Sequence, residues 1–141
     1  MGHGAETIAE AVRAVSGARI GVLVGSPGFG DLVTEVPFYR TLRKEFPNAT
    51  LYWIGEILKP WRKFFEIYLP EAVVYPYQLS NRPGVVLRNL RAAREARKMN
   101  WTLLLDTQRY FMHSLVLKQY RAKWTVGYSS GSLFSDIKMT D

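Results

Sequence analysis

The chain has 141 residues, 48% of them apolar, with 19 Lys and Arg against 12 Asp and Glu and a formal net charge of +7. These values favour one globular domain and exclude a disordered chain, and the basic balance favours anionic partners such as phosphorylated sugars, anionic membrane surfaces or nucleic acid. The sequence has no cysteine, which excludes disulfides, and no apolar run that approaches the roughly 20 residues needed to cross a bilayer.

Apolar periodicity predicts helices and strands that alternate along the chain. We take residues 1–18 as a lead-in helix, centred on 6–15, and 19–141 as the domain itself. The further elements, in chain order, are strand 19–24, helix 31–46, strand 50–54, helix 60–68, strand 72–75, helix 83–99, strand 101–105, helix 110–120 and strand 124–127. Residues 128–141 are expected to form a loop or a connection. This alternation implies an α/β fold with an open, mostly parallel sheet flanked by helices.

A glycine-rich turn follows the first predicted strand, and residues 24–31 read Val-Gly-Ser-Pro-Gly-Phe-Gly-Asp. A Walker-type loop needs Lys and then Ser or Thr after its second glycine to hold phosphates and magnesium, whereas the acidic Asp31 follows Gly30 here. The dinucleotide fingerprint needs three glycines, and Pro27 or Val33 falls where a glycine is required in either register. The turn therefore argues against NAD or ATP at this loop.

Two candidate loops lie at the carboxyl ends of predicted strands, where open α/β sheets bind ligands. One is the turn that ends in Asp31, and the other is the segment Asp106-Thr107-Gln108-Arg109. A helix N-terminus favours the ionised carboxylate, so Asp31 could accept a proton. Gln108 and Arg109 could bind a sugar hydroxyl or a carboxylate. The alternative is that Asp31 and Asp106 are ordinary helix N-caps.

Other polar and aromatic groups have plainer interpretations. His113 has no second ligand at metal spacing, so we predict no metal. The stretch 59–68 mixes aromatics with cations, which suits a helix at a membrane interface; alternatively, its aromatics pack on the sheet and its cations face water. The basic set in the helix 83–99 recurs mostly every three residues and is expected to wind around that helix as a solvated surface. This set is Arg88, Arg91, Arg94, Arg97 and Lys98.

The glycine turn and the residues that follow it form a recognisable combination. Gly-Phe-Gly-Asp at 28–31, Pro37, Leu-Arg-Lys-Glu-Phe-Pro-Asn-Ala at 42–49 and Leu-Tyr-Trp at 51–53 resemble the start of the ADP-heptose:lipopolysaccharide heptosyltransferase family. Leu-Asp-Thr-Gln at 105–108 resembles that family's Asp-x-Gln segment, and Val-Gly-Tyr at 126–128 resembles its strand end. The resemblance spans about residues 19–128.

This resemblance implies the N-terminal, Rossmann-like half of a GT-B glycosyltransferase that transfers a sugar with inversion to a lipopolysaccharide-type or related glycan acceptor. It implies Asp31 as the general base, and we expect Gly28, Gly30, Asp106, Gln108 and Arg109 to bind the substrate. No cofactor is implied, because the donor, ADP-heptose or a related sugar nucleotide, is itself a substrate. A C-terminal domain that this chain lacks would hold the donor, so we expect the chain alone to be inactive.

The sequence departs from the family within the turn. The family usually carries an arginine at the position of Gly25 and a glycine at the position of Pro27, so anion contacts at the loop should differ. A second hypothesis is therefore a non-catalytic Rossmann-like module that binds an anionic carbohydrate or a protein partner. Nucleic acid is not an expected partner, because the basic residues are scattered and no known binding motif is present. We expect a cytoplasmic protein, with peripheral contact to the inner face of the membrane through residues 59–68 as an open alternative.

Overall fold

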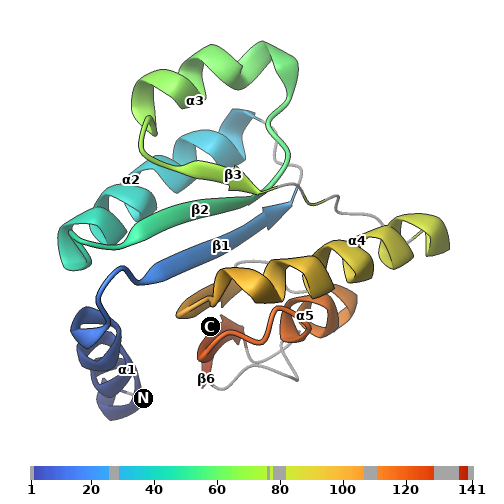
Figure 1. Ribbon diagram of the computed structural model, residues 1–141. Helices are drawn as coiled ribbons and strands as arrows, with labels where there is room; N and C mark the ends of the chain where they lie inside the picture. The colour runs from blue at the N-terminus through green and yellow to red at the C-terminus, as the bar shows by residue number, and fades with distance from the viewer. Residues whose placement is uncertain are drawn as a thin grey trace.

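The computed structural model describes residues 2–25, 29–75, 77, 82–106, 111–128 and 137–139, and the side chains of 7–24, 32–75, 77, 82–106 and 115–127. Helices and strands alternate along this part of the chain, as the sequence predicts (Figure 1). The helices are α1 (Gly2–Ala14), α2 (Phe29–Glu45), α3 (Arg62–Tyr68), α4 (Pro83–Ala96) and α5 (Phe111–Lys118), and short 3-10 turns are η1 (Lys59–Trp61) and η2 (Arg97–Met99). The strands are β1 (Arg19–Gly25), β2 (Thr50–Gly55), β3 (Val73–Tyr75), β4 (Leu103–Asp106), β5 (Trp124–Tyr128) and β6 (Ile137–Met139).

The strands form one sheet in the order β3-β2-β1-β4-β5-β6, and every neighbouring pair is parallel. This confirms the predicted open parallel α/β sheet. From β1 the chain moves outward to β2 and β3, and α4 then returns it to β4 on the other side of β1 (Figure 1). The strand order therefore reverses between β1 and β4, and open α/β sheets bind their ligands beyond such a reversal.

The expectation of a loop or a connection over residues 128–141 is wrong in part. Tyr128 belongs to β5, and β6 adds a further strand that pairs with β5 in parallel. A strand of three residues is too short to show an alternating pattern, so periodicity does not detect it. Pairing with β5, and not a sequence pattern, defines this edge of the sheet.

One face of the sheet packs against α1, α2 and α3. Alternate side chains of the central strands, such as Val22 and Trp53, belong to the hydrophobic cluster on this face. Helix α2 contributes buried residues at helical spacing, which are Leu32, Val36, Tyr39 and Leu42. The ring of Tyr39 stacks on Trp53 at a centroid distance of 5.7 Å, so an aromatic pair joins this helix to the sheet.

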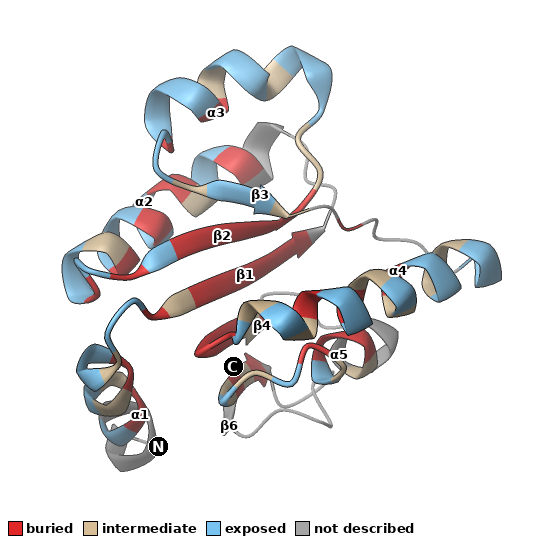
Figure 2. Cartoon of the chain, viewed as in Figure 1, coloured by how far each residue is buried: buried red, intermediate tan, exposed pale blue. Residues whose placement is uncertain are grey.

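The opposite face packs against α4 and α5 through an aromatic cluster around Trp101. The Trp101 ring lies 4.7 Å from Tyr52 and 5.6 Å from Tyr120, between ring centroids. Gly21 of β1 permits this packing, because a Cβ there would lie 2.7 Å from Ile54 and 3.0 Å from Trp101. The central strands are buried between the two helical layers (Figure 2), which explains their nearly continuous apolar sequences.

Candidate functional site at the carboxyl ends of β1 and β4

The carboxyl ends of β1 and β4 lie side by side, as the sequence predicts. Leu23 of β1 is the register partner of Asp106, the last residue of β4, and Asp106 also pairs with Gly127 of β5. Two residues beyond Leu23, β1 ends at Gly25. The turn after β1 and the segment after β4 therefore begin at neighbouring points on one edge of the sheet, beside the reversal of the strand order.

Asp31 occupies the first turn of α2. The helix begins at Phe29, so Asp31 is its third residue and the N-cap interpretation is not correct. Gly30 is the second helical residue, while Gly28 and the side chain of Asp31 lie outside the described parts of the structure. A carboxylate in the first turn is still stabilised by the positive end of the helix dipole, so this backbone position suits an ionised acid.

Asp106 is a buried strand residue. It lies five residues before the start of α5, so the N-cap interpretation is wrong for this residue as well. Its side chain has an exposed fraction of 0%, and it follows the alternation of β4 onto the face covered by α4 and α5. A buried charge needs polar partners, and Asp106 has an interaction of this kind. Asp106 is therefore buried at the carboxyl end of β4 and is not exposed at the edge of the sheet. Gln108 and Arg109 lie outside the described residues.

Tyr77 is a neighbour of Asp106 that the sequence analysis did not identify. The tyrosine is buried, and its pKa is raised above 10, first by burial and second by the negative charge of Asp106. It follows β3 by two residues and so lies at the carboxyl edge of the sheet. The rule that located Asp106 at a strand end also applies to β3, so a search for polar residues after this strand would have found Tyr77.

A hollow of about 400 Å³ lies at the outer edge of the sheet. It is lined by Ile57, Arg62, Phe65, Glu66 and Val74. Because β3 is two strands away from β1, this hollow does not belong to the reversal between β1 and β4. Its cation and its acid come from the same helix, α3, and are one turn apart, so the hollow carries no net charge.

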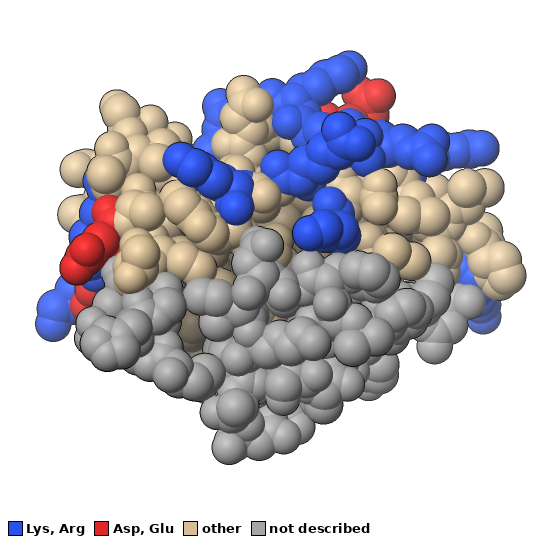
Figure 3. Space-filling view, turned by 90° about the horizontal axis from the view of Figure 1, so that it is seen from below, with Lys and Arg blue, Asp and Glu red and all other residues tan. Residues whose placement is uncertain are grey.

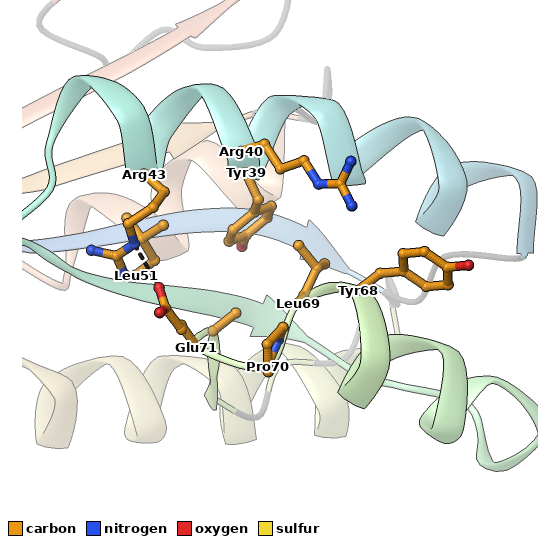
Figure 4. Close-up of a pocket in the computed structure, with 9 residues that line it drawn as sticks. Tyr39, Arg40, Arg43, Leu51, Tyr68, Leu69, Pro70 and Glu71 are labelled. Carbon is orange, nitrogen blue, oxygen red and sulfur yellow. Dashed lines mark ion pairs between the residues drawn. The ribbon is translucent and has the colours of Figure 1, made fainter.

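A second, smaller hollow of about 110 Å³ lies between α2 and the segment that leads into β3 (Figure 4). Arg43 closes one side of it, and its guanidinium points to Glu71 at an N···O distance of 2.9 Å. The same side chain donates hydrogen bonds to the carbonyl oxygens of Pro47 and Ala49. Arg43 is therefore occupied by protein partners, and its role is to join α2 to the sheet.

The aromatic residues of 59–68 mostly pack inward. Phe65 is buried with its ring 5.3 Å from Trp53, and Trp61 and Phe64 pack against the same core. Ile67 and Tyr68 remain exposed at the end of α3. The interpretation in which aromatics pack on the sheet therefore holds for Trp61, Phe64 and Phe65.

The backbone of His113 lies in α5, and its side chain is outside the described residues. Within the described residues no group of three or more His, Cys, Asp or Glu side chains is arranged to hold a metal ion. In the same part of the chain, no helix combines the length and the apolar character needed to span a bilayer.

These features define a Rossmann-like α/β domain with a candidate site at the switch point of its sheet. No protein-family model and no curated protein sequence matches the chain. Solved structures do match its fold, among them a glycosyl transferase family 9 protein from Veillonella parvula, with 18% sequence identity and a TM-score of 0.67. Another is the E. coli ADP-heptose lps heptosyltransferase II, with 16% identity and a TM-score of 0.68.

Each of these two alignments covers 87% of this chain and 35% of the solved chain. The chain therefore spans about a third of the length of the glycosyltransferases that it matches. At such low identity the similarity shows the fold alone, which is that of one half of a GT-B glycosyltransferase. A hydrogenase domain from Pyrococcus furiosus aligns with a TM-score of only 0.47, which carries no argument.

Proposed function

We propose that this chain is the acceptor-side domain of a heptosyltransferase-like glycosyltransferase and that Asp31 is its general base. The observation that carries the proposal is the position of Asp31 in the first turn of α2, the helix that follows β1, because the carboxyl end of β1 pairs with that of β4 where the strand order reverses. The fold similarity to two glycosyltransferases supports the reaction class. The acceptor would be a lipopolysaccharide-type glycan, and the donor a sugar nucleotide such as ADP-heptose, bound by a further domain.

The proposed reaction needs a general base near the acceptor hydroxyl. A sugar hydroxyl is a weak nucleophile, and its oxygen forms the bond to the anomeric carbon as the bond from that carbon to the diphosphate breaks. The diphosphate leaves with the electron pair, and the hydroxyl proton passes to the Asp31 carboxylate. A positioned base of this kind typically accelerates a reaction ~10²–10⁴-fold. Inversion follows because the hydroxyl attacks from the side opposite to the departing diphosphate.

Asp106 is best assigned a positioning role in this proposal. Its burial keeps the carboxylate from the solvent, and its charge acts on Tyr77 at the same edge. We therefore infer that Asp106 fixes the end of β4, from which Gln108 and Arg109 would reach the acceptor. Gly28 and Gly30 would let the acceptor approach the backbone of the turn closely, because neither carries a side chain.

The test is sugar transfer from ADP-heptose to a phosphorylated inner-core oligosaccharide, with this chain joined to a donor-binding half. The substitution Asp31→Asn should reduce turnover at least ~100-fold while acceptor binding is retained. The matched control Glu10→Gln removes an exposed acid from α1 and should leave turnover unchanged. Turnover that survives Asp31→Asn would contradict the base assignment.

A second candidate function is the non-catalytic module, and Gly25 favours it. An arginine at this position would offer an anion a bidentate contact, and glycine offers none. Binding of the oligosaccharide by this chain, without transfer by the joined protein, would support the module and contradict the enzyme.

A further inference from the structure

The net positive charge of the chain is concentrated in its second half. Residues 1–75 contain eight Lys and Arg and eight Asp and Glu, whereas residues 76–141 contain eleven Lys and Arg and four Asp and Glu. The second half therefore carries the whole formal charge of +7. In the view from below, Lys and Arg side chains gather on the side of the sheet where α4 lies, with few acids among them (Figure 3).

Helix α4 presents part of this charge as one face. Leu87, Arg91, Arg94 and Lys98 follow one another by four, three and four residues, so they share one side of the helix and of η2, over about 16 Å. All four are exposed, and Leu87 has an exposed fraction of 50%. We call these four residues the α4 basic face. The expectation that the basic set winds around its helix is therefore wrong for Arg91, Arg94 and Lys98.

Arg97 differs from Arg91 and Arg94 because its guanidinium is hydrogen-bonded to another part of the fold. It donates hydrogen bonds to the backbone oxygen of Gln119 at 2.6 Å and to its side-chain oxygen at 2.8 Å. Its pKa is lowered by partial burial and then by the charges of Arg121 and Arg94. Arg94 and Arg121 thus repel Arg97, and an anion placed beside them would relieve that repulsion.

The α4 basic face has little internal compensation. Arg91 and Arg94 form no ion pair with any residue that the structure describes, and Lys98 pairs only with Glu95, at 3.0 Å. In contrast, the stretch from Glu56 to Glu71 is neutral, because its three cations are matched by three acids. The exposed apolar residues of α3 are therefore not accompanied by a net positive charge that would attract them to an anionic membrane. The sequence had suggested a membrane contact for residues 59–68 as one alternative.

We propose that the α4 basic face docks the protein on an anionic lipid surface. Clusters of Lys and Arg on a helix bind acidic headgroups, and each cation near the surface strengthens binding about fivefold. Leu87 lies on the same face, and a lipid surface can bury this apolar side chain, whereas a phosphate backbone cannot. No aromatic side chain is exposed in 82–106 or 115–127, so this surface offers nothing for the stacking of nucleic-acid bases.

This inference does not depend on the proposed transfer reaction. It would place α4 along the membrane plane, with its N-terminal end toward the carboxyl edge of the sheet, because α4 follows β3 and runs back to the start of β4. A glycan anchored in the same surface would then lie near the candidate site. Vesicle binding and sugar transfer are measured separately, so either proposal can fail without the other.

The test is co-sedimentation of the 141-residue chain with vesicles of phosphatidylcholine and phosphatidylglycerol in equal parts, and with phosphatidylcholine alone. We expect binding to the anionic vesicles only, weakened by added salt. The variant Arg91→Gln/Arg94→Gln/Lys98→Gln should lower the partition coefficient on the order of 100-fold. The matched control Arg40→Gln/Lys44→Gln/Lys63→Gln removes the same charge from α2 and α3 and should lower it far less.

Two further variants keep the proposal falsifiable. Leu87→Ser should lower vesicle binding about tenfold, since it removes the apolar contact, and Arg91→Gln alone should lower it about fivefold. Circular dichroism checks that each variant is folded. Equal losses in both triple variants, no binding by the unmodified chain, or tighter binding to duplex DNA that depends on the α4 basic face would each overturn the proposal.

Discussion

The helical layer of α1, α2 and α3 and the layer of α4 and α5 cover opposite faces of one sheet, but they use charge differently. In the first layer, cations join elements that are distant in sequence. Arg13 of α1 pairs with Glu45 at the end of α2 at 2.6 Å, and Arg43 pairs with Glu71 at 2.9 Å. In the second layer, Arg91 and Arg94 project from α4 without an ion pair among the described residues.

This difference shows that the same residue type has different roles in the two layers. Exposed ion pairs contribute little free energy, so the value of Arg43 comes mainly from its partly buried hydrogen bonds. Arg91 and Arg94 have no comparable partners and are not needed to close the fold. Arginines of the first layer should therefore affect stability, whereas those of the α4 basic face should affect binding.

The largest stability effect should come from Gly21, where the second layer packs most tightly on the sheet. Gly21→Ala would place a Cβ against Ile54 and Trp101, so we expect a loss of about 1–3 kcal/mol in the free energy of unfolding. Gly84→Ala in α4 is the matched control, because no atom lies within 4 Å of a Cβ there. Urea denaturation measures both, and equal stabilities would show that the packing around Trp101 is loose.

The next effect separates the arginines of the two layers. Arg43→Met should lose about 1–2 kcal/mol of unfolding free energy, because it leaves the carbonyl oxygens of Pro47 and Ala49 without their donor. Arg91→Met should stay within about 0.5 kcal/mol of the unmodified chain, as exposed substitutions usually do. Thermal and urea denaturation check the pair. A larger loss of unfolding free energy for Arg91→Met than for Arg43→Met would contradict the different roles of these two arginines.

A smaller effect distinguishes two buried tyrosines. The hydroxyl of Tyr39 donates a 2.9 Å hydrogen bond to the carbonyl oxygen of Tyr52, so Tyr39→Phe should cost about 1 kcal/mol. The hydroxyl of Tyr120, in the second layer, has no hydrogen-bond partner among the described residues, so Tyr120→Phe should cost nothing or stabilise the fold. Denaturant midpoints decide between these outcomes, and a loss for Tyr120→Phe would indicate a partner for its hydroxyl.

The last effect is a loss of unfolding free energy at alkaline pH, which comes from buried tyrosines in both helical layers. Burial raises the pKa of Tyr39, Tyr77 and Tyr120 above the ordinary value of 10.0. Their stabilising effect is fully present below about pH 10 and is lost as the pH rises further, because the unfolded tyrosines then release protons that the folded ones keep. Unfolding free energy measured from pH 8 upward should fall above about pH 10. Tyr120→Phe should make that fall less steep.

The sequence predicts most of the fold, because each inner strand is a short apolar run between two helical patterns. Residues 20–24 of β1 and 51–55 of β2 are buried between the two helical layers, which is why they show no polar alternation. The prediction misses β6 because three residues carry too little pattern. The N-cap alternative for Asp106 is wrong, because a polar residue after an apolar run marks a strand end or a helix start equally well.

The candidate site is harder to predict, since function depends on a ligand that the fold does not specify. Topology explains why the carboxyl ends of β1 and β4 are neighbours. The roles of Asp31, Gln108 and Arg109 rest on the family resemblance and on chemical type. The α4 basic face was missed because Arg88 and Arg97 obscure the spacing of Arg91, Arg94 and Lys98 in the sequence, and only the structure shows that Arg97 turns to Gln119.

Titration of the 141-residue chain with a phosphorylated inner-core oligosaccharide, followed by backbone amide NMR shifts, tests whether an acceptor binds at the reversal of the strand order. We expect the largest shifts at the ends of β1 and β4 and in the first turn of α2, around Leu23, Asp31 and Asp106. Shifts confined to α4, or no shifts at all, would contradict an acceptor site at the reversal of the strand order.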